Sequence, residues 1–350
     1  DNTVGVQGVD TVRSADLYVG NSGTTVRLLT GALAGRPGSF TLDGDASLRT
    51  RPMNRVIAPL SQMGARIESR DGKTPLAITG QPLAGITYPM PVASAQVKSA
   101  ILLAGLCADG QTTVRESVQS RDHTERMLAA MGADITTDGL SVTVRRSTLQ
   151  PTDVTVCGDI SSAAYPLVLA ACVPGSRITV RNVGINPTRD GLLAVLRDSG
   201  ADVRLDAVRA DGEPAADITV RYTQLRPFTV GGALIPRLID EIPALAVLAC
   251  FIEGESVIRD AKELKVKESD RIATTVAMLT ALGAEAEPTD DGMIIRGKGS
   301  LLGGGTVDAG LDHRIAMSAA IAMAAARKGG TLLHGEVCAV SYPTFFGEVL

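Results

Sequence analysis

The sequence has few aromatic residues: phenylalanine, tyrosine and tryptophan together make up 3% of its 350 residues, and tryptophan is absent. Hydrophobic residues still account for 45% of the chain, so the interior must be filled mainly by Ala, Val, Leu and Ile. Small and β-branched side chains of this kind favour closely packed helices and strands. The length exceeds that of one ordinary domain and predicts two domains of about 150–200 residues each.

The chain also lacks a net positive charge and long apolar runs. The formal net charge is −4 at pH 7 and no block of basic residues occurs, which argues against nucleic acid or an anionic membrane as a partner. The longest apolar run, Ala163 to Val173, is too short to span a bilayer. Any anionic ligand must therefore be bound locally, by a few well-placed Arg and Lys side chains.

Metal-binding motifs are missing as well. The chain has no CxxC pair and no cluster of His and Cys, and its three histidines lie far apart, so no metal ion or other cofactor is expected. The five cysteines are odd in number and lie mostly within apolar runs, which indicates reduced thiols in a cytoplasmic protein. They are Cys107, Cys157, Cys172, Cys250 and Cys338.

What the sequence does contain is a repeat. The pattern Leu-x-x-x-Gly-Ala follows a helical pattern four times and precedes a strand-like stretch each time; its copies are Leu60–Ala65, Leu128–Ala133, Leu196–Ala201 and Leu279–Ala284. Glycine just past a helix is a common cap because it adopts a left-handed conformation without a Cβ clash. Three copies are followed by an Asp-Gly pair, which predicts a hairpin turn; the pairs are Asp71-Gly72, Asp138-Gly139 and Asp291-Gly292.

Five helices of small apolar residues alternate with these capped helices. Each opens with a polar cluster, at Asn21, Ser94, Ser161, Asp240 and Asp312. Beyond the first turn they are apolar nearly all round, which is typical of buried helices. The predicted unit is therefore a buried helix, a strand, an outer helix with the Gly-Ala cap, and a hairpin, in the mixed α/β (α+β) class.

The predicted domain boundary lies in the region of residues 145–155, giving a first domain of residues 1–155 and a second of residues 156–350. The chain starts with the strand-like stretch 1–9, and an outer helix begins near its last residue without a Gly-Ala cap. We therefore expect the first domain to lack its N-terminal part and the second its C-terminal end. The complete protein would then hold up to three units per domain.

The openings of the buried helices suit anionic ligands. A helix N-terminus presents unpaired N–H groups and a partial positive charge, which favour phosphate and carboxylate. Ordinary N-capping explains any one Ser, Asp or Asn at such a position. Five such openings, three of them with a cation within a turn at Arg27, Lys98 or Arg314, favour an anion site between the domains.

The outer helices carry further charge where they begin. Arg51 and Arg121 occupy this position in the first half, and the run "KVKESDR", residues 265–271, occupies it in the second. A solvated face with i,i+4 pairs explains most charge runs of this kind. The shared register of these cations in the repeat instead favours a common substrate-binding face.

Eight strings of the sequence resemble one family throughout and in the family's order, the 5-enolpyruvylshikimate-3-phosphate (EPSP) synthases. They are "NSGTTVRLL", "GDASLRTRPM", "SAQVKSAILLAGL", "RDHTERM", "GDISSAAYPL", "IDEIPALAVLA", "VKESDRI" and "DHRIAM". The versions "SAQVKSA" and "RDHTE" are similar to those of the bacterial subgroup known for members that tolerate the inhibitor glyphosate. The resemblance implies the two-domain enolpyruvyl transferase fold, an inverse α/β barrel in which sheets surround buried helices.

The resemblance also implies a reaction and its residues. The enolpyruvyl group of phosphoenolpyruvate moves to the 5-hydroxyl of shikimate 3-phosphate, and phosphate is released. Asp240 matches the base for the attacking hydroxyl, and Glu268 matches the acid for the methylene carbon. The residues that match the phosphoenolpyruvate site are Gly23, Arg51, Gln96, Arg271 and Arg314. Those that match the shikimate 3-phosphate site are Ser94, Ala95, Gln96, Ser120, Arg121, Asp240 and Lys267. A monomer that uses only these two small substrates is expected.

Departures from the family pattern affect three places. The family's opening Lys-Ser…Arg motif has no counterpart here, Val340 stands where some relatives have Lys, and Ala95 replaces a frequent Ser. Gly23 stands where many tolerant members have Ala, which predicts sensitivity to glyphosate. His123 is expected to begin an outer helix and His313 to pack beside Arg314, neither as a catalyst.

Two alternatives are weaker. The UDP-N-acetylglucosamine enolpyruvyl transferases carry a reactive Cys before an Arg-Pro pair, and the matching stretch "GDASLRTRP" has none. A non-catalytic relative would need the glycines and apolar helices but not Asp240, Glu268 and the three arginines of the phosphoenolpyruvate site.

Overall fold

One unit of secondary structure recurs along the chain: a strand, a buried helix, a second strand, an outer helix and a hairpin. The first copy consists of β1 (Ala15–Tyr18), α1 (Gly23–Ala34), β2 (Gly38–Asp43), α2 (Asn54–Gln62), β3 (Arg66–Arg70) and β4 (Lys73–Gly80). The second consists of β5 (Thr87–Pro89), α3 (Ala95–Gly105), β6 (Gln111–Arg115), α4 (His123–Ala130), β7 (Ile135–Asp138) and β8 (Ser141–Arg145). A further complete copy consists of β12 (Thr229–Val230), α8 (Ile242–Cys250), β13 (Gly254–Ile258), α9 (Arg271–Ala281), β14 (Glu285–Pro288) and β15 (Met293–Gly297).

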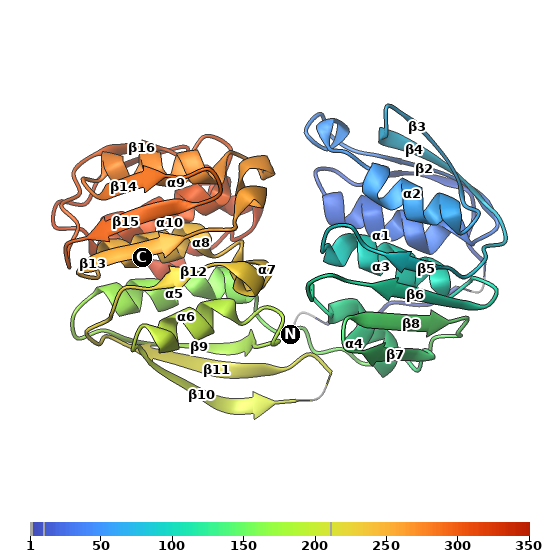
Figure 1. The fold of residues 1–350 in the computed structure, drawn as a ribbon, viewed down its shortest axis with the longest axis horizontal. Coiled ribbons are helices and arrows are strands. Elements are labelled where there is room, and N and C mark those ends of the chain that lie inside the picture. The colour runs from blue at the N-terminus through green and yellow to red at the C-terminus, as the bar shows by residue number, and fades with distance from the viewer. Residues whose placement is uncertain (1–2, 10, 211) are drawn as a thin grey trace. The chain divides into compact units, whose positions relative to one another are not determined.

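Two more copies are partial. One consists of α5 (Ile160–Cys172), β9 (Arg177–Gly184), α6 (Gly191–Asp198), β10 (Asp202–Arg209) and β11 (Ala215–Arg221). The other consists of β16 (Thr306–Asp308), α10 (His313–Ala325), β17 (Thr331–Leu333) and the short α11 (Phe345–Val349). The computed structural model describes residues 3–9, 11–210 and 212–350. Within it the chain divides into two units, Asp1–Val154 and Thr155–Leu350, and Figure 1 shows the elements of each.

The same sheet order appears in each complete copy. The strands run in the orders β1-β2-β4-β3, β5-β6-β8-β7 and β12-β13-β15-β14. The first pair of each sheet is parallel and the others are antiparallel. A parallel pair needs a crossover between its strands, and here the buried helix supplies it. The first strand was missing from the predicted unit because, with two residues in Thr229–Val230, it is too short to show a periodicity.

The Leu-x-x-x-Gly-Ala pattern is a helix C-terminal motif, as predicted. In the first copy the Ala65 N–H donates to the carbonyl of Leu60 at 2.9 Å, and the Gly64 N–H donates to that of Ser61 at 3.0 Å. These two bonds define the Schellman motif. The other three copies repeat the Ala-to-Leu bond at 2.9–3.0 Å, and all four glycines have φ between 78° and 96°. The left-handed backbone explains why glycine recurs at this point.

One local prediction needs correction, and another is confirmed with a different type of turn. Residues 3–9 form no strand in the structure, and Val4 and Val6 are 83% and 89% exposed; residues 1 and 2 lie outside the described part of the chain. The alternation of Val and polar residues there has no adjacent strand in the described residues to complete a sheet. At Asp291-Gly292 the hairpin exists, but Gly292 does not have a positive φ, so the turn differs from the one at Asp71-Gly72, where both φ values are positive, 54° and 66°.

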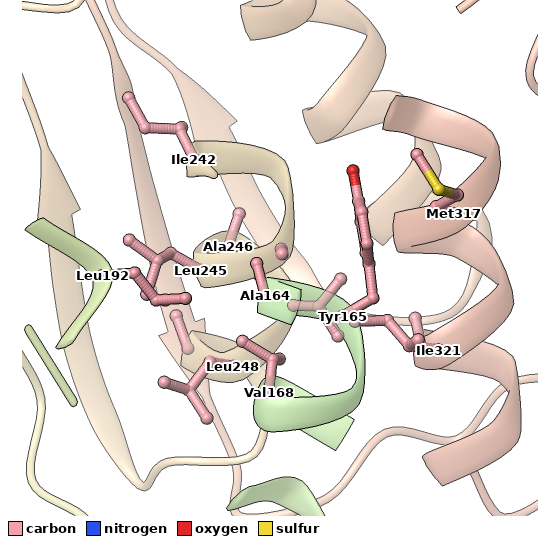
Figure 2. Packing of buried hydrophobic residues seen from close by; sticks show 14 of the residues in the cluster. Ala164, Tyr165, Val168, Leu192, Ile242, Leu245, Ala246, Leu248, Met317 and Ile321 are labelled. Atoms are coloured by element: carbon pink, nitrogen blue, oxygen red, sulfur yellow. The ribbon is translucent and has the colours of Figure 1, made fainter. Parts of the chain in front are cut away.

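Small residues let the buried helices approach closely, as their composition predicted. In the second unit α5, α8 and α10 pack against one another, and Figure 2 shows Ala164, Leu245 and Ile321 among the side chains that meet there. In the first unit α1 packs on α3. A Cβ on Gly31 of α1 would lie 2.0 Å from the carbonyl oxygen of Ala100 in α3, so only glycine permits this contact. Sheets thus surround buried helices, three of them in the second unit.

No helix in the described residues is long and apolar enough to cross a membrane. All five cysteines carry free thiols. Burial raises the pKa of the Cys250 thiol to about 12 and that of Cys172 well above its ordinary value. Both are therefore unreactive core residues at neutral pH.

Candidate active site

In the second unit the buried helices begin beside one another. Asp312 caps α10 by accepting from the Arg314 N–H at 3.0 Å, and the Arg314 Nη1 donates to the carbonyl of Asp240, just before α8, at 3.2 Å. Burial alone would lower the pKa of Arg314, but Tyr165 and the carboxylates of Asp240 and Glu241 raise it. The predicted residues Asp240 and Arg314 therefore belong to one cluster at the helix starts.

Arg271 is the centre of this cluster. Its side chain is 1% exposed and opens α9, because the Asp270 carboxylate caps that helix by accepting from the Ile272 N–H at 3.1 Å. Its three guanidinium nitrogens reach three carboxylates: Nε to Asp312 at 2.9 Å, Nη2 to Glu268 at 2.6 Å and Nη1 to Asp240 at 3.5 Å. One buried cation thus fixes both residues expected to move protons.

The two candidate proton-transfer residues differ in exposure. The Glu268 side chain is 36% exposed, whereas that of Asp240 is 14% exposed and lies 3.3 Å from the Lys267 ammonium. Glu268 is therefore open to a reactant, while Asp240 is enclosed by cations. The pKa of Asp312 is lowered, since hydrogen bonds and charge from Arg271 outweigh its burial.

His313 follows the cap residue Asp312 in this arrangement. It is buried in the first turn of α10. Its pKa is lowered by burial and by the neighbouring Arg314 and Arg271, so the ring is neutral at physiological pH. Among the described residues no group of three His, Cys, Asp or Glu side chains lies where it could share a metal ion.

Arg189 is a residue that the sequence reasoning missed. It is buried, its Nη2 donates to the Ser161 hydroxyl at 2.7 Å and lies 3.5 Å from Glu241 Oε1, and its Nη1 lies 3.9 Å from Asp240 Oδ2. It lies two residues before the outer helix α6, as Arg121 lies two residues before α4; Arg51 lies three residues before α2, and Arg271 is the first residue of α9. The register rule could have found it, but a lone Arg in "NPTRDG" gave no charge run to notice.

The first unit assembles its candidates around the starts of α1 and α3. Gln96, in the first turn of α3, donates from Nε2 to the Thr24 hydroxyl of α1 at 2.8 Å and accepts from Arg27 Nη1 at 2.5 Å. Arg51 Nη2 donates to the side-chain oxygen of Asn21 at 2.6 Å. Both arginines therefore donate to neutral amide oxygens. Burial and the nearby charges of Arg51 and Arg55 lower the pKa of Arg27.

Gly23 lies where these two cations converge. It is buried and is the first residue of α1, capped by Ser22. A Cβ at this position would lie 3.1 Å from Arg27 Nη1 and 3.2 Å from Arg51 Nη1. The structure thus brings the predicted residues Gly23, Arg51 and Gln96 together.

The remaining predicted residues of this unit gather near the start of α3. Ser94 caps the helix, accepting from the Val97 N–H at 3.5 Å, and Ala95 is its first residue. Ser120 is buried, and its hydroxyl has no hydrogen-bond partner among the described residues. Arg121 follows it and is half-buried. The hydroxyls of Thr74, Thr112, Thr275 and Ser318 are also buried without a partner among the described residues, so Ser120 is distinguished by its place beside Arg121 and not by this feature alone.

The chain is similar to known proteins over nearly its whole length. The family model described as EPSP synthase (3-phosphoshikimate 1-carboxyvinyltransferase) matches residues 2–349. The 3-phosphoshikimate 1-carboxyvinyltransferase of Geobacillus kaustophilus is 55% identical over 341 residues, which cover 96% of this chain and 80% of that protein. The enzyme of the same name from Shouchella clausii is 53% identical over 350 residues, covering 98% and 81%.

Solved structures are also similar to this chain. The EPSP synthase from Acinetobacter baumannii superposes with a TM-score of 0.85 at 44% identity, covering 95% of this chain and 77% of that one. The enolpyruvyl transferase NikO from Streptomyces tendae has a TM-score of 0.72 at 22% identity, covering 92% and 74%, and shares the fold. Helices enclosed by sheets in two units are thus the enolpyruvyl transferase architecture, as expected from the sequence.

Proposed function

The chain belongs to the EPSP synthase family, and we propose that its two units are two domains that divide the reaction between them. The enzyme is a 3-phosphoshikimate 1-carboxyvinyltransferase of the shikimate pathway. It transfers the enolpyruvyl group of phosphoenolpyruvate to the 5-hydroxyl of shikimate 3-phosphate and releases phosphate. In our proposal the second unit carries the groups that move protons, and the first carries cations that bind anionic groups.

The chemistry requires two proton transfers before phosphate leaves. The hydroxyl oxygen bonds to the central carbon of phosphoenolpyruvate as it loses its proton, and the methylene carbon gains one. That carbon then loses a proton as the bond to phosphate breaks, which restores the double bond. We assign the hydroxyl proton to Asp240 and the methylene proton to Glu268, because a base and an acid are needed on different atoms.

The observation that carries this assignment is the position of Arg271. One buried guanidinium contacts Asp240 and Glu268 at 3.5 and 2.6 Å, so it holds the two carboxylates at a fixed separation. Positioned groups of this kind accelerate reactions because they need no reorganisation when the reaction occurs. In this proposal Arg314 contacts phosphoenolpyruvate and Lys267 contacts the hydroxyl side of shikimate 3-phosphate. Arg271, whose charge is balanced by three carboxylates, acts on phosphoenolpyruvate through the residues that it positions.

The first unit supports the binding half of the proposal. Arg51 is held by the neutral Asn21 amide, so its charge is available to a phosphate or carboxylate of phosphoenolpyruvate, beside Gly23 and Gln96. Ser94, Ala95, Ser120 and Arg121 are assigned to shikimate 3-phosphate. The Ser120 hydroxyl, buried and without a partner in the described residues, is available to a ligand oxygen in this proposal.

Two general properties complete the proposal. We place the enzyme in the cytoplasm, because free thiols such as those of its five cysteines persist in reducing compartments. We expect a monomer, to be measured by light scattering after size-exclusion chromatography. A mass of two chains would contradict that part alone.

The test is steady-state kinetics of the protein completed at both ends and of matched variants of that protein. Wild-type protein should release phosphate from phosphoenolpyruvate only when shikimate 3-phosphate is present. Asp240→Asn and Glu268→Gln should each lower kcat by about 10² or more, the usual scale for a general acid or base, with a few-fold change in KM. Glu255→Gln, which changes an exposed carboxylate paired with Arg296, is the control and should leave kcat unchanged. A near-normal kcat in either site variant would remove that residue from its role.

A further inference from the structure

A buried ion cluster in the first unit has no part in the mechanism so far. Lys98 lies within the apolar helix α3 and its side chain is 1% exposed. We propose that Lys98 is a positioning residue that shapes the shikimate 3-phosphate side of the site by holding the backbone of Ser120. This inference rests on the proposed function of Ser120 and Arg121 and deepens it.

The contacts of Lys98 account for all its donors. Its Nζ lies 2.6 Å from Glu125 Oε1, 2.8 Å from Glu116 Oε2 and 3.5 Å from the carbonyl oxygen of Ser120. An ammonium group has three N–H donors, so none is left for a ligand. Lys98 therefore acts on a substrate only through the groups that it holds.

Hydrogen bonds hold both polar groups of the Ser120 backbone. Lys98 donates to its carbonyl, while its N–H donates to Glu116 Oε1 at 3.2 Å. Glu116 is itself fixed by Lys98, so one ion pair orients both polar groups of this residue. The Ser120 hydroxyl, in contrast, has no partner in the described residues. The ion pair therefore fixes the backbone from which this hydroxyl projects, and the hydroxyl itself is left open to a ligand.

Stability alone does not explain the cluster. Placing charged groups in the protein interior costs several kcal/mol of desolvation for each ion, and well-packed apolar residues of similar size are often as stable or more so. A Met at position 98 would continue the apolar face of α3 without that cost. The charged arrangement supplies orientation instead, since hydrogen bonds fix the Ser120 peptide where dispersion contacts would not.

The cluster also joins two separate motifs. Lys98 belongs to "SAQVKSA" and Glu125 to "RDHTE", two strings that are separated in the sequence. Next to their ion pair the Ser99 and Thr124 hydroxyls share a hydrogen bond of 2.7 Å. The start of α3 and the segment that carries Ser120 and Arg121 are therefore tied together at two adjacent points.

The decisive variant removes the cluster without leaving buried charge. Lys98→Met alone leaves two buried carboxylates without a compensating cation. It is therefore combined with Glu116→Gln and Glu125→Gln. The triple variant should unfold at a temperature close to wild type, but its KM for shikimate 3-phosphate should rise about tenfold or more, the scale of a lost hydrogen bond to a charged group. The KM for phosphoenolpyruvate and kcat should change less than about threefold.

Two single variants sharpen the test. Glu125→Gln leaves the Lys98–Glu116–Ser120 contacts in place and should keep the wild-type KM for shikimate 3-phosphate. Glu116→Gln keeps an acceptor for the Ser120 N–H but weakens the ion pair with Lys98. Its KM for shikimate 3-phosphate should therefore lie between the KM of Glu125→Gln and that of the triple variant. If the triple variant fails to fold, this intermediate rise decides the question.

The outcomes separate the inference from the proposed function. Wild-type turnover in the same assay establishes the reaction independently of Lys98. A folded triple variant with the wild-type KM for shikimate 3-phosphate would overturn the positioning role, as would equal increases of both KM values. An absence of substrate-dependent phosphate release in the wild type would instead overturn the proposed function.

Discussion

The two units surround their arginines with different partners. In the first unit Arg27 and Arg51 rest on the amide oxygens of Gln96 and Asn21. In the second unit Arg271 rests on three carboxylates. Amide partners orient a cation without cancelling its charge, whereas carboxylate partners cancel it and are themselves fixed in place. The same architecture thus carries cations with neutral partners in the first unit and a charge-balanced cluster in the second, which fits the proposed division into anion binding and proton transfer.

The difference lies in side chains and not in the frame that carries them. Each outer helix ends in the same Schellman motif, and each complete copy has the same sheet order. Arg51 lies three residues before α2 and Arg271 is the first residue of α9, so each lies near the start of an outer helix. The repeat therefore supplies a position, and the neighbouring residues decide what the cation there does.

Removing the central cation of the second unit should have the largest effect. Arg271→Gln leaves Asp312, whose side chain is 1% exposed, without its compensating charge. Breaking a buried ion pair from one side costs about 3–5 kcal/mol, so we expect a loss of that size in the free energy of unfolding. Urea denaturation at neutral pH measures it. A loss below about 1 kcal/mol would show that Asp312 is compensated by other groups.

The matching change in the first unit should act on binding. Arg51→Gln removes a cation whose partner is a neutral amide, so the free energy of unfolding should change by less than about 0.5 kcal/mol. The KM for phosphoenolpyruvate should rise about 10- to 100-fold, the scale of a charge-assisted hydrogen bond. Arg49→Gln is the control, since Arg49 pairs with Asp43 nearby. Equal effects of both variants would mean that only the overall charge matters.

The carboxylates of the second unit should also make stability depend on pH. The pKa of Asp312 is lowered in the folded protein, so its ion pair contributes stability above the ordinary Asp pKa of about 3.9. That contribution is lost as the pH falls through the lower, folded value. Asp312→Asn should be less stable than wild type at pH 7 and should lose less stability between pH 5 and pH 3. Parallel curves for the two proteins would contradict the role of Asp312.

The helix ends test the part that the two units share. Gly64 and Gly200 both have a φ of 96°, and a Cβ on either would meet no atom closer than 3.8 Å. Alanine should therefore cost only the left-handed backbone penalty of about 1–2 kcal/mol at each site. Gly5→Ala, at an exposed site with no neighbouring atom within 4 Å, is the control. Unequal losses at Gly64 and Gly200 would show that the two units do not share one frame.

Much of this frame could be predicted from the sequence because it depends on local patterns. The apolar runs that follow Asn21, Ser94, Ser161, Asp240 and Asp312 predicted the five buried helices, and the Gly-Ala caps predicted where the outer helices end. The first strand of each copy could not be predicted. A strand as short as Thr229–Val230 forms only because the parallel strand beside it supplies hydrogen bonds.

The candidate site was predictable in its residues but not in its pairings. The register of outer-helix starts pointed to Arg51 and Arg271, yet nothing local indicates that one meets an amide and the other three carboxylates. Those partners are distant in sequence, as Asn21 is from Arg51. Lys98 was noted as a cation near a helix start, but its two buried partners became visible only with the fold. Tertiary contacts decide such pairings, and periodicity does not record them.

Gly23 allows the most sensitive test of the anion binding proposed for the first unit. Its φ is not in the left-handed region, so Gly23→Ala should leave the free energy of unfolding unchanged or raise it by about 0.4–1 kcal/mol. The new methyl group would press on the ends of Arg27 and Arg51 at 3.1 and 3.2 Å. Guanidinium ends can shift by a few tenths of an ångström, so the KM for phosphoenolpyruvate should rise by less than about tenfold.

Glyphosate should respond more strongly than the substrate to this change. Because the inhibitor is longer than phosphoenolpyruvate, it has less room to move away from a methyl group added between the two cations. We therefore expect its inhibition constant to rise at least about tenfold more than the KM for phosphoenolpyruvate, a difference of about 1.4 kcal/mol in binding free energy. Inhibition constants and KM values of both proteins, measured in one assay, give the ratio directly. Equal increases for the two ligands would mean that the methyl group acts only by displacing the arginines, and no increase for either would place Gly23 away from the bound anion.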